Sequence, residues 1–161
     1  IGNTVLYGAT SGKLFASGQS GERFAVRNSG ADAVVEGCDS NGCEYMTGGT
    51  VVILGKVGDN FAAGMTGGMA FVYDPNNFFS NYVNYESVFC CKLEKSYWEN
   101  VLKELVDRHI RFTNSMIAKE IIANWEIEKN NFWQVVPNEV LETLEHPVSS
   151  QDNKDLEKKM A

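Results

Sequence analysis

Met46-Thr47-Gly48-Gly49 recurs further along the chain as Met65-Thr66-Gly67-Gly68. The same spacing, here called the repeat step, connects other glycines in the first half of the sequence: Gly12, Gly30, Gly49 and Gly68 in one ladder, and Gly18, Gly37 and Gly55 in another. A fixed period of about 20 residues is typical of stacked repeats, in which each repeat buries its apolar face against its neighbours. The glycines therefore indicate the corners of a coil before they indicate a chemical site.

Short apolar runs lie between these glycines, and each is bounded by Gly, Asn, Asp or Ser, which is typical of strands joined by turns. The runs are Thr4–Tyr7, Lys13–Ala16, Arg23–Val26, Ala33–Val35, Thr50–Leu54 and Met69–Val72. Two strands fit in each period, with glycine at corners where neighbouring backbones leave little room. Residues 1–74 therefore predict three to four rungs of a right-handed parallel β-helix. An antiparallel sandwich with glycine-rich turns is the alternative.

Composition narrows the class of protein. The 161 residues suffice for one domain, and the net charge of −7 argues against non-specific nucleic-acid binding, which needs a basic surface. The sequence contains no apolar run long enough to predict a membrane span. It starts at Ile1, within an apparent strand, whereas a natural chain would start with Met. We therefore expect it to be a piece of a longer chain.

The four cysteines, Cys38, Cys43, Cys90 and Cys91, do not have the spacing of a zinc or haem site. We expect free thiols in an intracellular protein, cytoplasmic or organellar. A Cys38–Cys43 disulfide is the alternative, and it would require an oxidising compartment.

The second half of the chain has a different character. Residues 75–92 are rich in Asn, Phe and Tyr, and they predict an irregular segment, with one short strand, whose aromatic rings pack over the coil. Residues 93–150 predict a helical cap over the last rung, whose strand edges would otherwise be open. Residues 151–161 are charged and without periodicity, which predicts a disordered tail.

Within the predicted cap, one helix face is marked by apolar residues at spacings of three and four. Its members are Trp98, Val101, Leu102, Leu105, Val106, His109 and Phe112. A second helix is predicted to begin near Thr113–Ser115, which are good N-cap residues, and to bury Ile117, Ile121, Ile122 and Trp125. Phe132–Val136 predicts a last strand or extended segment, and Val140, Leu141 and Leu144 predict a short helix.

The search for chemistry finds no reacting centre. Gly55–Gly58 lacks the residue order of a P-loop, and Gly18–Gly21 lacks the dinucleotide fingerprint and a surrounding βαβ unit. Polar residues at or beside the corners are expected to be solvated or to bond main-chain N–H groups. These are the carboxylates Glu22, Glu36, Asp39, Glu44 and Asp59, and the amides Asn3, Asn28 and Asn60, which we expect to cap turns or to ladder along the stack.

Two further groups have structural interpretations. We expect Arg23 and Arg27 to pair with Glu22, Glu36 or Glu44. His109 lies on the apolar helix face, where a lone histidine is more often packed and hydrogen-bonded than catalytic. We therefore assign no catalytic, cofactor-binding or metal-binding residue from the sequence.

Several long motifs resemble one known family. Leu6–Ala16, Gly21–Ala31, Gly42–Gly49 and Gly64–Gly68 resemble the glycine-rich (GXGXG) β-helix domain at the C-terminus of the large, or α, subunit of glutamate synthase. The helical half resembles it at His109, Thr113, Ser115, Ala118, Ile121, Asn124, Trp125 and Val135–Pro137. The resemblance covers residues 2–145. It departs in two ways: the β-helix of the family has further rungs before the position of Ile1, and residues 76–91 differ from most members in detail.

The resemblance implies a structural domain that holds the glutaminase and FMN-binding synthase domains of one long chain in relation. It also implies a parent enzyme that converts glutamine and 2-oxoglutarate to two glutamates. That enzyme uses FMN, an iron–sulfur cluster, and a reduced nicotinamide or ferredoxin as electron donor. The cysteines here match neither the nucleophile nor the cluster ligands of the family, so no cofactor is expected in this chain.

Two other functions remain as alternatives: a free-standing β-helix for ligand binding or subunit interaction, and a protein like the glycine-rich subunit of formylmethanofuran dehydrogenase. The long helical region disfavours the latter. The open first rung also predicts a dimer, because an unpaired strand edge can pair with a second copy.

Overall fold

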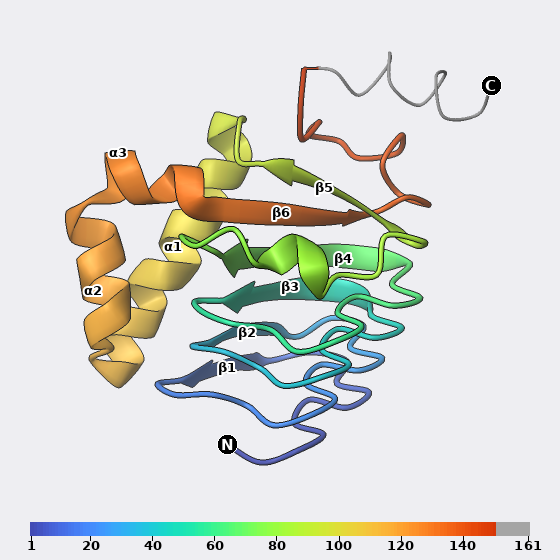
Figure 1. Ribbon diagram of the computed structural model, residues 1–161, viewed down its shortest axis with the longest axis horizontal. Helices are drawn as coiled ribbons and strands as arrows, with labels where there is room; N and C mark the ends of the chain where they lie inside the picture. The colour runs from blue at the N-terminus through green and yellow to red at the C-terminus, as the bar shows by residue number, and fades with distance from the viewer. Residues whose placement is uncertain (151–161) are drawn as a thin grey trace.

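The computed structural model describes residues 1–150 and shows a coil of stacked rungs with helices along one side (Figure 1). The predicted tail, 151–161, lies outside the described residues. Each rung contributes one parallel strand to a common sheet. These strands are β1 (Lys13–Ala16), β2 (Asp32–Val35), β3 (Thr47–Ile53) and β4 (Gly67–Tyr73). The solenoid stacking and the helices that follow it confirm the predicted fold class.

The register of the sheet reproduces the repeat in the sequence. Val34 pairs with Val52, and Val52 pairs with Phe71, so each pairing advances the chain by one repeat step. Beyond β4, the sheet continues with antiparallel partners, in the order β1-β2-β3-β4-β6-β5. Here β5 is Val88–Lys92 and β6 is Phe132–Pro137, the last strand expected from the sequence.

The glycine ladder has a steric cause. A Cβ atom on Gly48 would lie 2.2 Å from the carbonyl oxygen of Ser29, and one on Gly67 would lie 2.1 Å from that of Thr47. No side chain fits at either position unless the rungs move apart. The expectation that ladder glycines lie where backbones approach closely is confirmed for Gly30, Gly49, Gly55 and Gly68, whereas nothing lies within 4 Å of a Cβ atom on Gly12 or Gly18.

The second strand expected in each rung does not form. Thr4–Tyr7 and Arg23–Val26 lie in six-residue turns, 3–8 and 22–27, and equivalent turns occupy 40–45 and 59–64. In these turns alternate residues have positive φ: Thr4, Leu6 and Gly8; Arg23, Ala25 and Arg27; Asn41, Cys43 and Tyr45; Asn60, Ala62 and Gly64.

Rung-to-rung hydrogen bonds explain why these turns form although most of the positive-φ residues are not glycine. Ala25 N–H donates to the Val5 carbonyl at 2.9 Å, and Cys43 N–H donates to the Phe24 carbonyl at 2.8 Å. A left-handed residue costs about 1–2 kcal/mol, so the conformation needs such tertiary support. The sequence of one apolar run does not reveal these hydrogen bonds, because neighbouring rungs supply them. Such a run therefore looks like a strand when it is considered by itself.

The sheet is buried on both faces. Side chains that point into the coil form one core, which includes Phe24, Met46, Ile53, Phe61 and Met65. Side chains on the outer face, including Val34, Val52 and Phe71, pack with the helices in a second core. Successive strand residues point to opposite faces, so one strand serves both cores.

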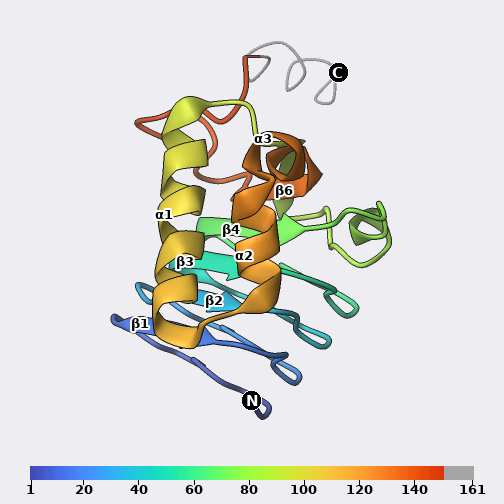
Figure 2. The same ribbon diagram turned by 90° about the vertical axis from the view of Figure 1, so that its left-hand side faces the viewer.

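Within residues 1–150, three α-helices lie along the outer face of the sheet (Figure 2). They are α1 (Ser96–Thr113), α2 (Met116–Ala123) and α3 (Trp125–Glu128), and short 3₁₀ helices occupy η1 (Phe79–Asn81) and η2 (Lys129–Asn131). On α1, Leu102, Leu105, Val106 and His109 are buried as expected, whereas Phe112 is 70% exposed and stacks on Phe15. Ser115 caps α2, as the sequence predicts.

The position of the helices differs from the expected cap. We expected them to cover the open edge of the last rung, but that edge pairs with β6, and β5 pairs with β6 in turn. The strands can extend the sheet because β6 supplies main-chain groups to β4, which helix side chains cannot do. The helices instead cover the apolar outer face.

Two smaller expectations are wrong. Residues 138–143 form turns with isolated bonds such as Val140 N–H to the Pro137 carbonyl, so the short helix near Leu144 is absent. Among the aromatic residues of 75–92, Phe79 is buried and Phe89 is partly buried, but Phe78, Tyr82 and Tyr85 are exposed. The Asp74 carboxylate fixes the main chain here by accepting hydrogen bonds from the Phe78 and Phe79 amides.

Candidate functional site

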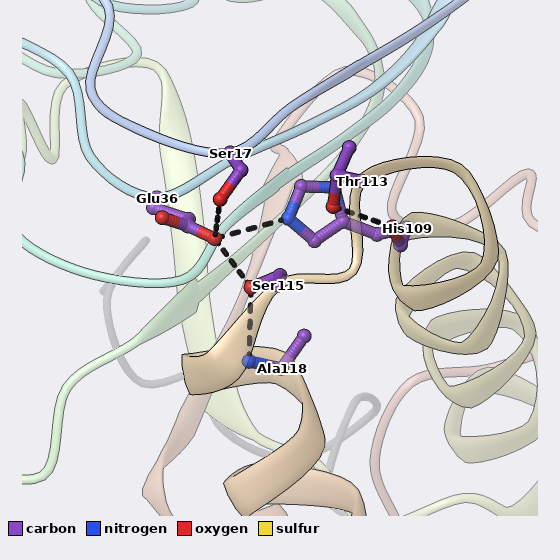
Figure 3. Close-up of polar contacts among 6 residues, drawn as sticks. All are labelled: Ser17, Glu36, His109, Thr113, Ser115 and Ala118. Atoms are coloured by element: carbon purple, nitrogen blue, oxygen red, sulfur yellow. Dashed lines mark hydrogen bonds and ion pairs between the residues drawn. The ribbon is translucent and has the colours of Figure 1, made fainter.

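A cluster of polar side chains between the coil and the helices consists of Ser17, Glu36, His109 and Ser115, and is here called the junction (Figure 3). Ser17 follows β1, and Glu36 follows β2 at the corresponding corner of the next rung. His109 lies on α1, and Ser115 lies in the short connection to α2. The repeat thus stacks two junction residues, and the α1–α2 connection brings the other two to them.

One oxygen atom of Glu36 holds the junction together. Glu36 Oε1 accepts hydrogen bonds from Ser17 Oγ at 3.1 Å and from Ser115 Oγ, and it lies 3.3 Å from His109 Nε2. Ser115 Oγ also accepts a hydrogen bond from the Ala118 amide at 3.2 Å, so the residue that caps α2 is bound to the coil. Thr113 Oγ1 donates to the His109 carbonyl at 2.6 Å at the end of α1.

The junction is arranged for a carboxylate beside a neutral imidazole. Burial alone would raise the pKa of Glu36, but hydrogen bonds from Ser115, His109 and Ser17, together with attraction to His109, hold this pKa below its ordinary value. Burial lowers the pKa of His109, against the opposing effect of Glu36. At neutral pH the contact is therefore a hydrogen bond from Nε2–H to a carboxylate rather than an ion pair.

The buried imidazole carries an unsatisfied atom. The His109 side chain is fully buried, and its Nδ1 has no hydrogen-bond partner within residues 1–150. With the proton on Nε2, Nδ1 is an acceptor, and leaving a buried acceptor unpaired costs about 1–3 kcal/mol. A proton on Nδ1 would add a buried charge, which reinforces the neutral state.

The order of contacts differs from that of a nucleophilic triad. In a triad, the imidazole lies between the acid and the hydroxyl and accepts the proton of the hydroxyl. Here Glu36 lies between His109 and Ser115, and the Ser115 hydroxyl donates to the carboxylate. The His109 nitrogen that meets Glu36 is already the donor, so the junction has no base positioned to activate Ser115. The junction can attach α1 and α2 to the coil and fix their orientation.

The structure brings only part of the predicted polar set together. Glu36 and His109 meet, and the expectation that His109 is packed and hydrogen-bonded is confirmed. Arg23 and Arg27 form no ion pair within residues 1–150, so their expected pairing with Glu22, Glu36 or Glu44 is wrong. The arginines are exposed on the six-residue turns, whereas Glu36 lies at a corner beside the helices.

The three asparagines bond within or between turns, as expected. Asn3 Oδ1 accepts a hydrogen bond from the Glu22 amide of the next rung at 3.0 Å. Asn28 is fully buried and bonds both main-chain groups of Ala31, and Asn60 accepts from Asn84. The expected bonding of corner carboxylates to main-chain N–H groups is seen for Asp39, which accepts from the Ser40 amide.

Cys38, Cys43 and Cys90 are free thiols, as expected, and no Cys38–Cys43 disulfide forms. Burial raises the pKa of Cys38 and of Cys90 to about 12, and it raises the pKa of Cys43 strongly. These buried thiols are therefore protonated at neutral pH. No group of three or more His, Cys, Asp or Glu within residues 1–150 is arranged to hold a metal ion.

Sequence reasoning missed the two serines of the junction. Ser17 and Glu36 are separated by one repeat step of the glycine ladder, and this signal could have placed them at one corner. Nothing in the sequence links Ser115 to Glu36, because 79 residues separate them and the contact depends on how α1 packs.

Comparison with known proteins gives the family. Residues 1–138 match the family model described as the GXGXG motif. The chain belongs to the GXGXG motif family. That match includes all four coil strands and the helices, so the junction lies wholly within the GXGXG region.

Relatives of this GXGXG chain are glutamate synthases from diverse organisms. The chain is 64% identical over 148 residues to the glutamate synthase [NADPH] large chain of Azospirillum brasilense, which is 92% of this chain and 10% of the relative. It is 52% identical to the ferredoxin-dependent glutamate synthase of Pyropia yezoensis over 85% of this chain and 9% of the relative. It is 47% identical to glutamate synthase [NADH] of Schizosaccharomyces pombe over 94% of this chain and 7% of the relative.

The GXGXG chain thus spans about a tenth of the length of the curated relatives it matches. Within residues 1–150, no helix is both long and apolar enough to cross a membrane.

Proposed function

We propose that this chain is the structural C-terminal domain of a glutamate synthase, and that it holds the glutaminase and FMN-binding synthase domains in relation. The observation that carries the proposal is the 64% identity over 92% of the chain to a glutamate synthase large chain of which it covers only 10%. The identity is high, and the matched region is only a small part of the relative. We therefore expect this chain to be the corresponding domain of a similar enzyme and to have the same role in it.

The geometry of the junction supports a structural role. Its carboxylate bonds two hydroxyl groups and one neutral imidazole, and the hydroxyl of Ser115 has no base. The parent enzyme would form two glutamates from glutamine and 2-oxoglutarate, as an intracellular oxidoreductase. Its FMN, iron–sulfur cluster and electron donor would bind to other parts of the longer chain; within residues 1–150, no three or more His, Cys, Asp or Glu side chains are grouped to hold a metal ion.

Truncation of the full-length enzyme tests the proposal. The gene that contains this sequence would be expressed whole and with a stop codon before Ile1, and two activities would be measured: glutamine hydrolysis and glutamate synthesis from glutamine and 2-oxoglutarate. We expect the truncated enzyme to keep hydrolysis and to lose synthesis. Unchanged synthesis would refute a role in holding the domains, and a gene without glutaminase and synthase regions would refute the assignment itself.

A further inference from the structure

A cleft of about 310 Å³ opens beside the third corner of the coil, one rung beyond the corner that carries Glu36. It lies between the ends of β3 and β4, the loop that carries η1, and the start of α2. Its lining includes Lys56, Val57, Asp74, Phe78, Tyr82 and Ile117.

The cleft exists because the coil stops there. Asp74 stands one repeat step after Gly55, where the ladder would place another corner glycine, and Pro75 follows it. The Asp74 amide donates to the Asn131 carbonyl at 2.8 Å, so the chain turns towards β6 instead of completing the corner. The third corner is consequently left without the covering rung that the lower corners have.

Main-chain donors remain open at this corner. At the lower corners, the Ser20 amide donates to the Gly37 carbonyl at 2.9 Å, and the Cys38 amide donates to the Lys56 carbonyl at 3.0 Å. The Val57 amide, at the equivalent place one repeat step later, has no acceptor within residues 1–150. The Lys56 amide has none there either, as is also true of its equivalents Gln19 and Gly37 at the lower corners. Open amides beside a cleft can donate to the main chain of an extended segment, so these amides suit a segment that brings carbonyl or carboxylate oxygens.

The rim of the cleft is held in place and is apolar. The Asp74 carboxylate accepts hydrogen bonds from the Phe78 amide at 3.0 Å, the Phe79 amide at 2.9 Å and Trp133 Nε1 at 3.2 Å. This fixes the loop while Phe78 and Tyr82 remain 54% and 38% exposed. Aromatic side chains at a rigid, exposed rim are typical anchors of protein interfaces.

Lys56 gives the cleft a positively charged side chain without an ion-pair partner within residues 1–150. Lys56 is exposed, in a protein that carries a net charge of −7. The Asp74 carboxylate, which also lines the cleft, already accepts hydrogen bonds from three donors. An unpaired cation beside open amides favours a carboxylate.

We propose that the cleft docks an extended acidic segment of the same glutamate synthase chain, from outside residues 1–161. The segment sets an apolar side chain against Phe78 and Tyr82, a carboxylate on Lys56, and main-chain oxygens on the open amides. This rests on the proposed function, in which this region is part of a longer chain. The relatives place about nine-tenths of their length outside the matched region, so most of the same chain is available to supply such a segment.

A photo-crosslink in the full-length enzyme tests the docking. Phe78 would be replaced by p-benzoylphenylalanine, the enzyme irradiated, and the crosslinked peptides identified by mass spectrometry. The expected product joins position 78 to an Asp- or Glu-containing peptide outside residues 1–161 in the same chain. Lys56→Glu should reduce its yield at least about tenfold, because it places like charges together. Arg27→Glu makes the same charge change on an exposed residue away from the cleft and should leave the yield unchanged.

Three results would overturn the docking proposal. They are crosslinks confined to residues 1–161, crosslinks to a second copy at twice the chain mass, and a yield that does not respond to Lys56→Glu. Each can occur while truncation before Ile1 still abolishes glutamate synthesis, in which case the structural function stands and only the cleft assignment fails. Unchanged synthesis after truncation would remove the structural function as well.

Discussion

Glu36 is the residue at which the coil and the helices meet. Its neighbours on the corner, Ser17 from the rung below and Ser115 from the α1–α2 connection, donate to the same oxygen atom. A carboxylate suits this position because it accepts several hydrogen bonds at once and needs no donor of its own. The contribution of Glu36 to the free energy of unfolding can be measured by substituting its hydrogen-bond partners one at a time.

Ser115→Ala removes two interactions together: the bond to Glu36 and the cap of α2. We expect the free energy of unfolding to fall by about 1–3 kcal/mol, since a partly buried carboxylate loses a donor and a helix loses its N-cap. Urea denaturation would measure the change. Ser80→Ala, at an exposed position of η1, is the control and should stay within about 0.5 kcal/mol; equal effects of the two substitutions would contradict the role given to Ser115.

The junction also makes stability depend on pH. Because burial lowers the pKa of His109 below 6.5, the stability contributed by the neutral ring is present above pH 6.5 and is lost as the pH falls towards the folded-state pKa. The pKa of Glu36 is lowered as well, so its contribution is present above pH 4.5 and is lost as the pH falls further.

His109→Gln tests the first of these stages, because a Gln side chain can donate to Glu36 but does not titrate. We expect the free energy of unfolding of the unaltered protein to decline as the pH falls below 6.5, and the variant to show a shallower decline. Denaturation curves at several pH values would measure both slopes. Parallel slopes would show that His109 does not titrate on unfolding.

At the scale of elements, two features close each rung of the coil: glycines where backbones are in contact, and the six-residue turns. Glycine is required where two backbones meet, whereas the turns place residues such as Ala25 and Cys43 in the left-handed region with support from adjacent rungs. The strands β1 to β4 then follow from the apolar runs between these two features.

Gly48→Ala tests the close approach of the rungs. The added Cβ would meet the Ser29 carbonyl oxygen at 2.2 Å, so the rungs must separate, and we expect a loss of about 1–3 kcal/mol in the free energy of unfolding. Thermal and urea unfolding would measure it. Gly2→Ala provides the matched control, because nothing lies within 4 Å of its Cβ position. A Gly48→Ala protein as stable as Gly2→Ala would mean that the backbone spacing tolerates a side chain.

At the scale of the whole molecule, one sheet separates two cores and belongs to both. Ala33 and Val35 face the inside of the coil, while Val34 between them faces the helices. Neither layer can lose its packing without exposing a face of this sheet. We therefore expect the coil and the helices to unfold together.

Phe61→Ala tests this coupling from the side of the coil interior. Phe61 is fully buried there, and its loss should cost about 3–5 kcal/mol. Tryptophan fluorescence reports on the helices and β6, which hold Trp98, Trp125 and Trp133, and far-ultraviolet circular dichroism reports on the whole fold. Both urea midpoints should fall by the same amount; a fluorescence midpoint that stays in place would show independent layers. Tyr85→Ala, at an exposed ring, is the control and should move neither.

The sequence by itself determined the repeat, and with it the coil. The repeat step places Gly48 and Gly67 at equivalent corners, and the apolar runs between corners become β1 to β4, because both signals depend on local residues at fixed spacing. The apolar face of α1 and the cap at Ser115 were also predictable, since helix periodicity and capping involve residues only a few positions apart.

Only the tertiary structure decided the rest. The runs at Thr4–Tyr7 and Arg23–Val26 curl into turns because adjacent rungs bond their main chains, which no single run reveals. The edge of β4 pairs with β6, which lies far along the chain, and Glu36 meets Ser115 across 79 residues. These contacts depend on where whole elements pack, and packing is set by the summed burial of two cores rather than by the residues that finally touch.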